Sequence, residues 1–319
     1  MVNLLIFKER LKTFYGKYDV YLIALWKFIL SYVTFFMLNR SIGSMAMLKN
    51  PFVGLLLALL CSLMPYGVIV SVAAIFMLLH LSSISMELAL VTGILLILVG
   101  ILYYGQQPGD SILLLLTPLL FAFKIPYAIP LIGGLALGLS SVIPIASGVC
   151  IYYILLYVKE NMGVLTNGAQ TELLQKYSQA IDSVLTNPHM LLMAAAFALA
   201  FLFVNVLRRM SINYAWILAI AVGTIALAAV LFLGSMQMNL RLDTLDLVLG
   251  MFVSLLLAAG YHFFVFAVDY SRIEHVQYED DEYYYYVKAV PKIMVTEPDV
   301  RIQKISGARR QSRNIRERD

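Results

Sequence analysis

The chain has 319 residues, of which 61% are hydrophobic and 13% charged, with a mean hydropathy of +0.84 and a formal net charge of +4. Soluble domains are about 45–50% apolar and about 25% charged, so this composition excludes a water-soluble enzyme of this size. The apolar residues lie in uncharged blocks of about 18 residues or more, which is the length that a helix needs to cross a bilayer. The sequence therefore predicts an all-α, polytopic helical membrane bundle.

The first 19 residues are predicted to form a cytoplasmic amphipathic, basic segment, because lysines and an arginine alternate with apolar side chains at helical spacing. The apolar run 20–38 follows. It has no small-residue cleavage site after a short core, so we interpret it as a retained anchor and not as a signal peptide. Asn50-Pro51 predicts the next helix start, because Asn can cap a helix and Pro is tolerated at its first position.

The stretch from Phe52 to Tyr104 contains one formally charged side chain, Glu87, and must hold several consecutive spans. Pro65-Tyr66-Gly67 and the serine cluster 82–85 are the predicted interruptions. A second apolar block, 111–158, cannot be two straight helices, because proline kinks a helix and glycine permits an unwound turn. Its prolines and glycines are Pro118, Pro126, Pro130, Pro144, Gly133, Gly134, Gly138 and Gly148.

The C-terminal half predicts an extracytoplasmic amphipathic segment at 160–187 and three spans, at 188–207, 212–234 and 245–268. A hydrophilic tail, 269–319, follows the transmembrane domain 20–268. The positive-inside rule places the basic N-terminal segment, Arg208-Arg209 and the Arg-rich tail in the cytoplasm. Three long or five short crossings between the first span and the span that ends at Val158 both satisfy this rule. We therefore expect eight or ten spans with both termini cytoplasmic.

The Pro/Gly-broken block is the candidate binding region. Transporters use discontinuous helices to aim backbone dipoles at a solute near the midplane, and Lys124 adds an ionisable group to an otherwise apolar block. The alternative is that proline and glycine serve only close helix packing. If the five short crossings are correct, Lys124 lies only at a membrane interface. Glu87 could relay protons or bind a cation, with Lys27 as its partner. It could instead be a first-turn acid at the interface, while Lys27 snorkels. The candidate residues are Lys124, Pro126, Pro130, Gly133, Gly134, Gly138, Ser140, Ser141, Pro144, Ser147 and Glu87.

Catalytic and metal sites are poorly indicated. The segment Gly138-Leu139-Ser140-Ser141 with a later His262 would suit an intramembrane serine hydrolase of the rhomboid type, but no glycine follows the serine. Metalloprotease and phosphate-loop motifs are absent. The four histidines have no ligand spacing, and Cys61 and Cys150 lie in apolar runs. We expect no metal, no cofactor and no assigned catalytic residue.

The tail has an unusual composition. An acidic run at 279–282 continues into a tyrosine run whose strand propensity predicts a small hairpin, with Pro298 as a possible turn, or a strand added to a partner protein. Its basic end suits anionic lipid headgroups better than nucleic acid, unless it is only a solubilising tail. The candidate partner-binding tyrosines are Tyr283, Tyr284, Tyr285 and Tyr286, and the basic residues are Arg309, Arg310, Arg313, Arg316 and Arg318.

Three classes of function remain. The broken block and the number of spans favour a permease or a membrane subunit of a transport system. The scarcity of polar groups within the spans favours a non-catalytic scaffold that recruits partners through the tail. The intramembrane serine hydrolase is a minor third. The short loops and the retained anchor make a bacterial cytoplasmic membrane the expected location.

Overall fold

The structure, a computed structural model, describes residues 2–104, 110–167, 181–182, 186–266, 268 and 270–292. Over these ranges the chain is mainly helical, which confirms the predicted all-α class. Five of the described helices are long and apolar enough to cross a membrane. They contain Leu4–Ile42, Leu139–Gly163, Pro188–Leu207, Ala215–Gln237 and Thr244–Val265.

The first helix, α1 (Val2–Ile42), joins the predicted surface segment to the first predicted span without a break in helical assignment. Its backbone leaves helical geometry at Tyr18, where φ is −122°, so the two parts meet at a kink close to the predicted boundary. Before the kink, the Nζ of Lys8 donates a hydrogen bond to the carbonyl of Phe263 over 2.9 Å. The start of the chain is thereby held at the end of the last helix.

After the short helix α2 (Ala46–Lys49), the next three helices are α3 (Pro51–Ser62), α4 (Tyr66–Ser82) and α5 (Met86–Tyr104). The predicted start at Asn50-Pro51 is confirmed, because the Asn50 side chain accepts a hydrogen bond from the amide of Phe52. Both predicted interruptions are also confirmed, since α4 begins directly after Pro65 and ends at Ser82, the first residue of the serine cluster.

The broken block contains α6 (Ile112–Ala122), α7 (Ala128–Ala136), a 3-10 turn η2 (Leu139–Ser141) and α8 (Val142–Asn167). The prediction that it is not two straight helices is therefore confirmed. Pro130 and Pro144 lie in the first turns of α7 and α8, where a backbone N–H has no partner within the helix and its loss costs little. Pro118 alone of the block's prolines lies well inside a described helix, α6.

The last three helices are α10 (Pro188–Leu207), α11 (Ala215–Gln237) and α12 (Thr244–Val265), close to the predicted spans. Asn187 caps α10 by accepting hydrogen bonds from the amides of His189 and Met190, and Asp243 caps α12 in the same way. Helix α8 continues past Val158 to Asn167. The rest of the predicted amphipathic segment 160–187 lies almost wholly outside the described residues.

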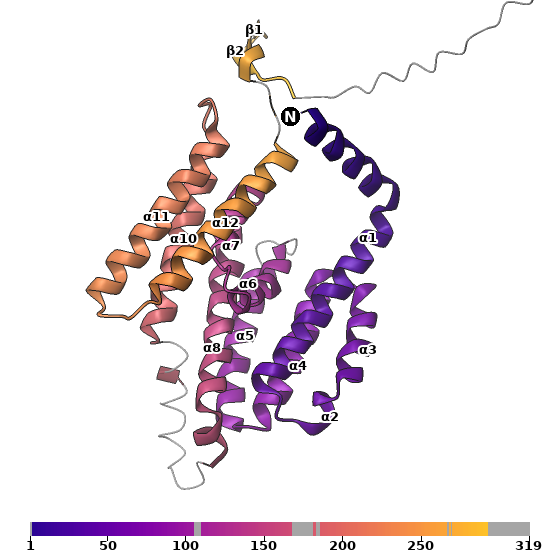
Figure 1. Cartoon of the computed structure of the whole chain (residues 1–319), viewed down its shortest axis with the longest axis vertical. Helices are drawn as coiled ribbons and strands as arrows, with labels where there is room; N and C mark the ends of the chain where they lie inside the picture. The colour runs from indigo at the N-terminus through magenta and orange to yellow at the C-terminus, as the bar shows by residue number, and fades with distance from the viewer. Residues whose placement is uncertain are drawn as a thin grey trace, which may run out of the picture.

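The helices pack as two lobes. The core of the first lobe is built from α1, α3, α4 and α5, and that of the second lobe is built from α7, α10, α11 and α12 (Figure 1). Helices α6 and α8 belong to both: Leu119 and Ile154 pack in the first core, whereas Phe121 and Ile145 pack in the second. The wall between the lobes is therefore made of α6 and α8.

The end of α7 is fixed by polar side chains of the second lobe. The guanidinium of Arg208 donates hydrogen bonds to the carbonyls of Leu135 and Leu137. The amide Nδ2 of Asn205 donates to the Leu137 carbonyl over 2.8 Å. These carbonyls belong to the last turn and cap of α7, where a helix leaves carbonyl groups without internal partners. Arg208 and Asn205 therefore replace the water that would otherwise satisfy them.

A β-hairpin follows the last helix, made of β1 (Glu274–Glu279) and β2 (Tyr284–Ala289) in antiparallel register. Its turn carries Asp280, whose carboxylate accepts hydrogen bonds from the amides of Glu282 and Tyr283 and from the Tyr285 hydroxyl. These bonds, that from Glu282 foremost, lower the pKa of Asp280. The predicted hairpin thus exists, but it turns at the acidic run. Pro298 and the five tail arginines lie outside the described residues.

The hairpin and both described ends of the chain lie at one end of the molecule, and α2 lies at the other (Figure 1). Lys288 of β2 donates hydrogen bonds to the Ser211 carbonyl, over 3.2 Å, and to the Asn213 side chain in the α10–α11 turn. The rings of Tyr214 and Tyr270 also meet at 4.4 Å. The beginning of the tail is therefore held against the same turn that carries Arg208-Arg209.

Candidate binding cavity

A cavity of about 710 Å³ lies beside the wall between the lobes, on the side of the first lobe. Helices α1, α4, α5, α6 and α8 line it. Pockets that hold small molecules have volumes of about 300–1,000 Å³, so the cavity is large enough for a ligand.

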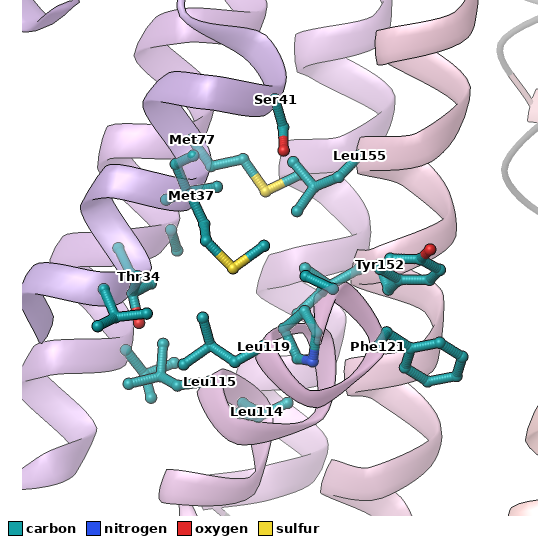
Figure 2. A pocket seen from close by; sticks show the side chains of 18 of the residues that line it. Thr34, Met37, Ser41, Met77, Leu114, Leu115, Leu119, Phe121, Tyr152 and Leu155 are labelled. Carbon is teal, nitrogen blue, oxygen red and sulfur yellow. The ribbon is translucent and has the colours of Figure 1, made fainter. Parts of the chain in front are cut away.

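The cavity wall is mainly apolar and flexible. Figure 2 shows Met37 of α1 and Met77 of α4 on one side, and Leu119 of α6 and Leu155 of α8 across from them. Methionine side chains are unbranched and polarisable, so they adapt to ligands of different shape. A few hydroxyl groups, such as that of Ser41, interrupt this surface.

Small residues leave the space open. Gly67 and Ala73 of α4 and Gly100 of α5 line the cavity. A Cβ atom built on Gly100 would meet no other atom within 4 Å. The lack of side-chain volume on these two helices is therefore one reason for the cavity.

Three cations, Arg40, Lys124 and Lys159, also line the cavity. They come from α1, from the α6–α7 turn and from α8, and all three are exposed. Among the described residues that line the cavity, none is an aspartate or a glutamate. The local charge of the wall is thus positive.

Lys124 connects the cavity to the second lobe. Its Nζ lies 2.5 Å from Oδ2 of Asp246 in the first turn of α12, and this hydrogen bond raises the pKa of Lys124. The Lys124 backbone has a φ of +62°, in the left-handed region, which turns the chain sharply between α6 and α7. A Cβ at Gly250 would lie only 2.8 Å from the Lys124 carbonyl, so this turn can approach α12 closely because that residue is a glycine.

Aromatic rings close the side of the cavity that faces the second lobe. Phe121 stacks on Tyr152 with ring centroids 4.4 Å apart, and it also stacks on Phe197 of α10 with centroids 5.5 Å apart. Both Phe121 and Tyr152 line the cavity, at the right of Figure 2. Offset ring pairs of this kind add packing energy beyond their buried area. These ring contacts therefore join the cavity wall to the second lobe.

Of the eleven binding residues predicted from the sequence, Lys124 alone lines this cavity within the described part of the chain. Gly133 and Gly134 instead face α10: a Cβ on Gly134 would lie 2.7 Å from Cβ of Val204. Pro130 is also buried, in α7, the helix that carries both glycines. Their surroundings correspond to the alternative reading, in which small residues allow close packing.

The remaining predicted residues are scattered over other elements. The Ser141 hydroxyl donates to the carboxylate of Asp110, and that of Ser147 donates to the Ile143 carbonyl. Glu87 accepts a hydrogen bond from Ser85 in the first turn of α5. Pro126 precedes α7, Gly138 and Ser140 lie at η2, and Pro144 lies in α8. Tyr283 to Tyr286 lie in the hairpin.

The residues considered for a serine hydrolase are Ser140 in η2 and His262 in α12. His262 packs against the rings of Trp216 and Phe266 at the end of α12. Ring contacts of this kind are common for aromatic residues at a membrane interface. The pairing of Ser140 with His262 stays a prediction.

Sequence reasoning missed Arg40 and Lys159 as site residues. Arg40 ends an apolar run and Lys159 begins a polar segment, and cations at both places are expected for topology alone. No signal in the sequence distinguishes a cation that faces a cavity from one that faces the headgroup layer.

No protein-family model matches this chain, and neither does any curated protein or solved structure. The cavity and its lining residues are therefore the basis for assigning a function.

Proposed function

We propose that the protein is a permease-like membrane protein, or the membrane subunit of a transport system, that takes a largely apolar solute into the cavity between α1, α4, α5, α6 and α8. The observation that carries this proposal is an apolar space of about 710 Å³ inside a chain rich in membrane-length helices. A hydrophilic solute would need more polar partners than the few hydroxyl groups present.

For the membrane arrangement we propose ten passes, with α6 and α7 as short inner ones and both termini cytoplasmic. One end of α7 is held by Arg208 next to the hairpin, and the α6–α7 turn is held by Asp246 at the start of α12. Helix α7 has 9 residues, or about 14 Å, which is too short to face lipid across a full core. Most of α7 is buried in protein, so it need not match the lipid thickness.

We further propose that the part of α1 before the kink lies in the cytoplasmic interface of the membrane. Leu4, Phe7, Leu11 and Phe14 are exposed at the spacing of a single helical stripe. Cations flank this stripe, as expected of a helix that lies in the headgroup layer. The Lys8 bond to the end of α12 holds this part of the helix at the level where the last span ends.

Cysteine accessibility tests the proposed cavity. In a background with Cys61→Ala and Cys150→Ala, Ser41→Cys places a thiol on the cavity wall and Ser254→Cys places one in a fully buried position of α12. Both changes preserve side-chain size. We expect a small thiol reagent to modify position 41 and not position 254. If the reagent modifies neither thiol, the cavity is not accessible and the proposal of solute binding has no support.

A second candidate function is a scaffold that recruits a partner through the tail. The hairpin favours it, because neither strand pairs with a further strand within the described ranges, and the side chains of Tyr284 and Tyr286 are 68% and 78% exposed. A chain without residues 274–319 should insert normally but lose the partners that cross-link to the full chain in the membrane. Recovery of the same cross-linked partners without the tail would contradict this role.

A further inference from the structure

We propose that the ligand of the cavity is an anionic amphiphile, with one alkyl chain among the apolar residues and an anionic headgroup held by Arg40 and Lys159. This inference rests on the proposed function, since it assigns the chemistry of the solute that the cavity takes up.

The charge of the wall selects the headgroup. Arg40 and Lys159 both line the cavity, from α1 and from α8. Within the described part of the chain neither is bonded to a carboxylate, whereas Lys124 is already paired with Asp246. Two cations that have no carboxylate partner among the described residues, beside an apolar space, attract an anion. A guanidinium also offers a fork of donors that fits a carboxylate or a phosphate.

The rest of the cavity selects the alkyl chain. Met37, Met77, Leu119 and Leu155 form facing apolar walls (Figure 2). Burying a polar solute there would leave its groups without partners, at a cost of several kcal/mol for each charge. A molecule that is apolar along its length and negatively charged at one end satisfies both parts of the site.

The position of the cations also assigns a leaflet. Arg40 lies next to the end of α1 and Lys159 lies in the C-terminal half of α8, both toward the end of the molecule that carries α2 (Figure 1). This end is opposite the basic N-terminal segment and the hairpin. With both termini cytoplasmic, the headgroup would face the extracytoplasmic leaflet.

The test uses the full chain in nanodiscs of phosphatidylcholine, which has no net charge. The probes are a hexadecanoic acid that carries a photoreactive diazirine on its chain and the methyl ester of the same molecule. Cross-linked peptides are identified by mass spectrometry. We expect the acid to label peptides of α1, α4, α6 and α8, the ester to label them weakly, and hexadecyl phosphate to compete with the acid.

Matched variants test the headgroup contact. Arg40→Gln combined with Lys159→Gln should lower labelling by the acid about thirtyfold, the factor for two charges at roughly 1 kcal/mol each. Lys49→Gln combined with Arg241→Gln removes two cations that do not line the cavity and should change nothing. Arg40→Lys combined with Lys159→Arg keeps the charges, so it should retain most of the labelling and shows that variants at these positions fold.

The outcomes separate the two proposals. If acid and ester label the cavity peptides equally, or if the double Gln variant labels like the native chain, the anionic headgroup is refuted while uptake of an apolar solute stands. If neither probe labels the cavity peptides, both proposals fail.

Discussion

A pair of identical substitutions at two glycines tests the cavity by opposite effects on stability. Gly100 of α5 faces open space, whereas a Cβ at Gly134 of α7 would lie 2.7 Å from Cβ of Val204 and 3.2 Å from the backbone oxygen of Phe201. Valine is stiff at its branched Cβ and the Phe201 oxygen belongs to a helix backbone, so neither atom can move away easily. The same methyl group is therefore free in one place and blocked in the other.

The magnitudes follow from two terms. Replacing a helical glycine by alanine contributes about 0.5–1 kcal/mol of stability, because alanine loses less conformational freedom on folding. Overpacking a tight interior costs about 1–3 kcal/mol. We therefore expect Gly100→Ala to stabilise the protein by about 0.5–1 kcal/mol and Gly134→Ala to destabilise it by up to about 2 kcal/mol. The two variants should therefore differ in stability by about 1–3 kcal/mol. This difference does not depend on helix propensity, because both variants replace a helical glycine by alanine.

The assay is thermal unfolding in detergent, followed by a dye that becomes fluorescent when it reacts with thiols. Cys61 is buried and Cys150 is partly buried, so both report unfolding. One kcal/mol shifts the Tm of a domain of about 200 residues by roughly 2–4 °C. The Tm should rise for Gly100→Ala and fall for Gly134→Ala. Equal losses in both variants would mean that Gly100 faces packed atoms and that the cavity does not extend to this part of α5.

Three further predictions concern the end of α7, the hairpin and the membrane placement of α1. Arg208→Gln should lower stability by about 1–3 kcal/mol in the same assay, because two carbonyls at the end of α7 lose a charged donor. The control Arg209→Gln should change stability by no more than about 0.5 kcal/mol. Equal losses in the two variants would contradict the role of the Arg208 guanidinium. The hairpin should be ordered at a pH above the ordinary aspartate pKa of about 3.9, and it should lose order as the pH falls through the lowered pKa of Asp280. NMR of the backbone amides of the hairpin would show this transition. A transition at the ordinary pKa would contradict the link between Asp280 and the order of the hairpin. In a background in which Trp26 and Trp216 are replaced by Phe, brominated lipids should quench the tryptophan fluorescence of the Phe14→Trp variant and leave that of the Thr13→Trp variant unchanged. Equal quenching of the two variants would contradict the interfacial placement of α1.

The helix boundaries that the sequence predicts well are those with local signals. Asn50-Pro51 and Asn187-Pro188 each combine a capping side chain with a residue that needs no N–H, and both begin helices at Pro51 and Pro188. The prolines of the broken block are harder to interpret. Pro130 and Pro144 lie in first turns, where they are compatible with a regular helix, so their number overstates how often helices are broken inside.

The site was less predictable than the fold. Lys124 stands out in the sequence because it is a lone cation in an apolar block, and the structure places it on the cavity wall. The rest of the wall comes from five helices. Which face of each helix meets the others depends on tertiary packing. The helices are apolar on all sides, so the pattern of hydrophobic residues does not separate a face toward lipid from one toward a cavity.

The shared wall links the cavity to the second lobe. Helix α6 lines the cavity, stacks Phe121 against Phe197 of α10, and ends at the Lys124–Asp246 pair. An increase in cavity volume on this side therefore requires α6 to move relative to α10 or α12. Packed interiors do not deform continuously, so such a movement would proceed as a step between two arrangements. The exposed pair between Lys124 and Asp246 is weakly held in water, which makes it the contact that such a step would break first.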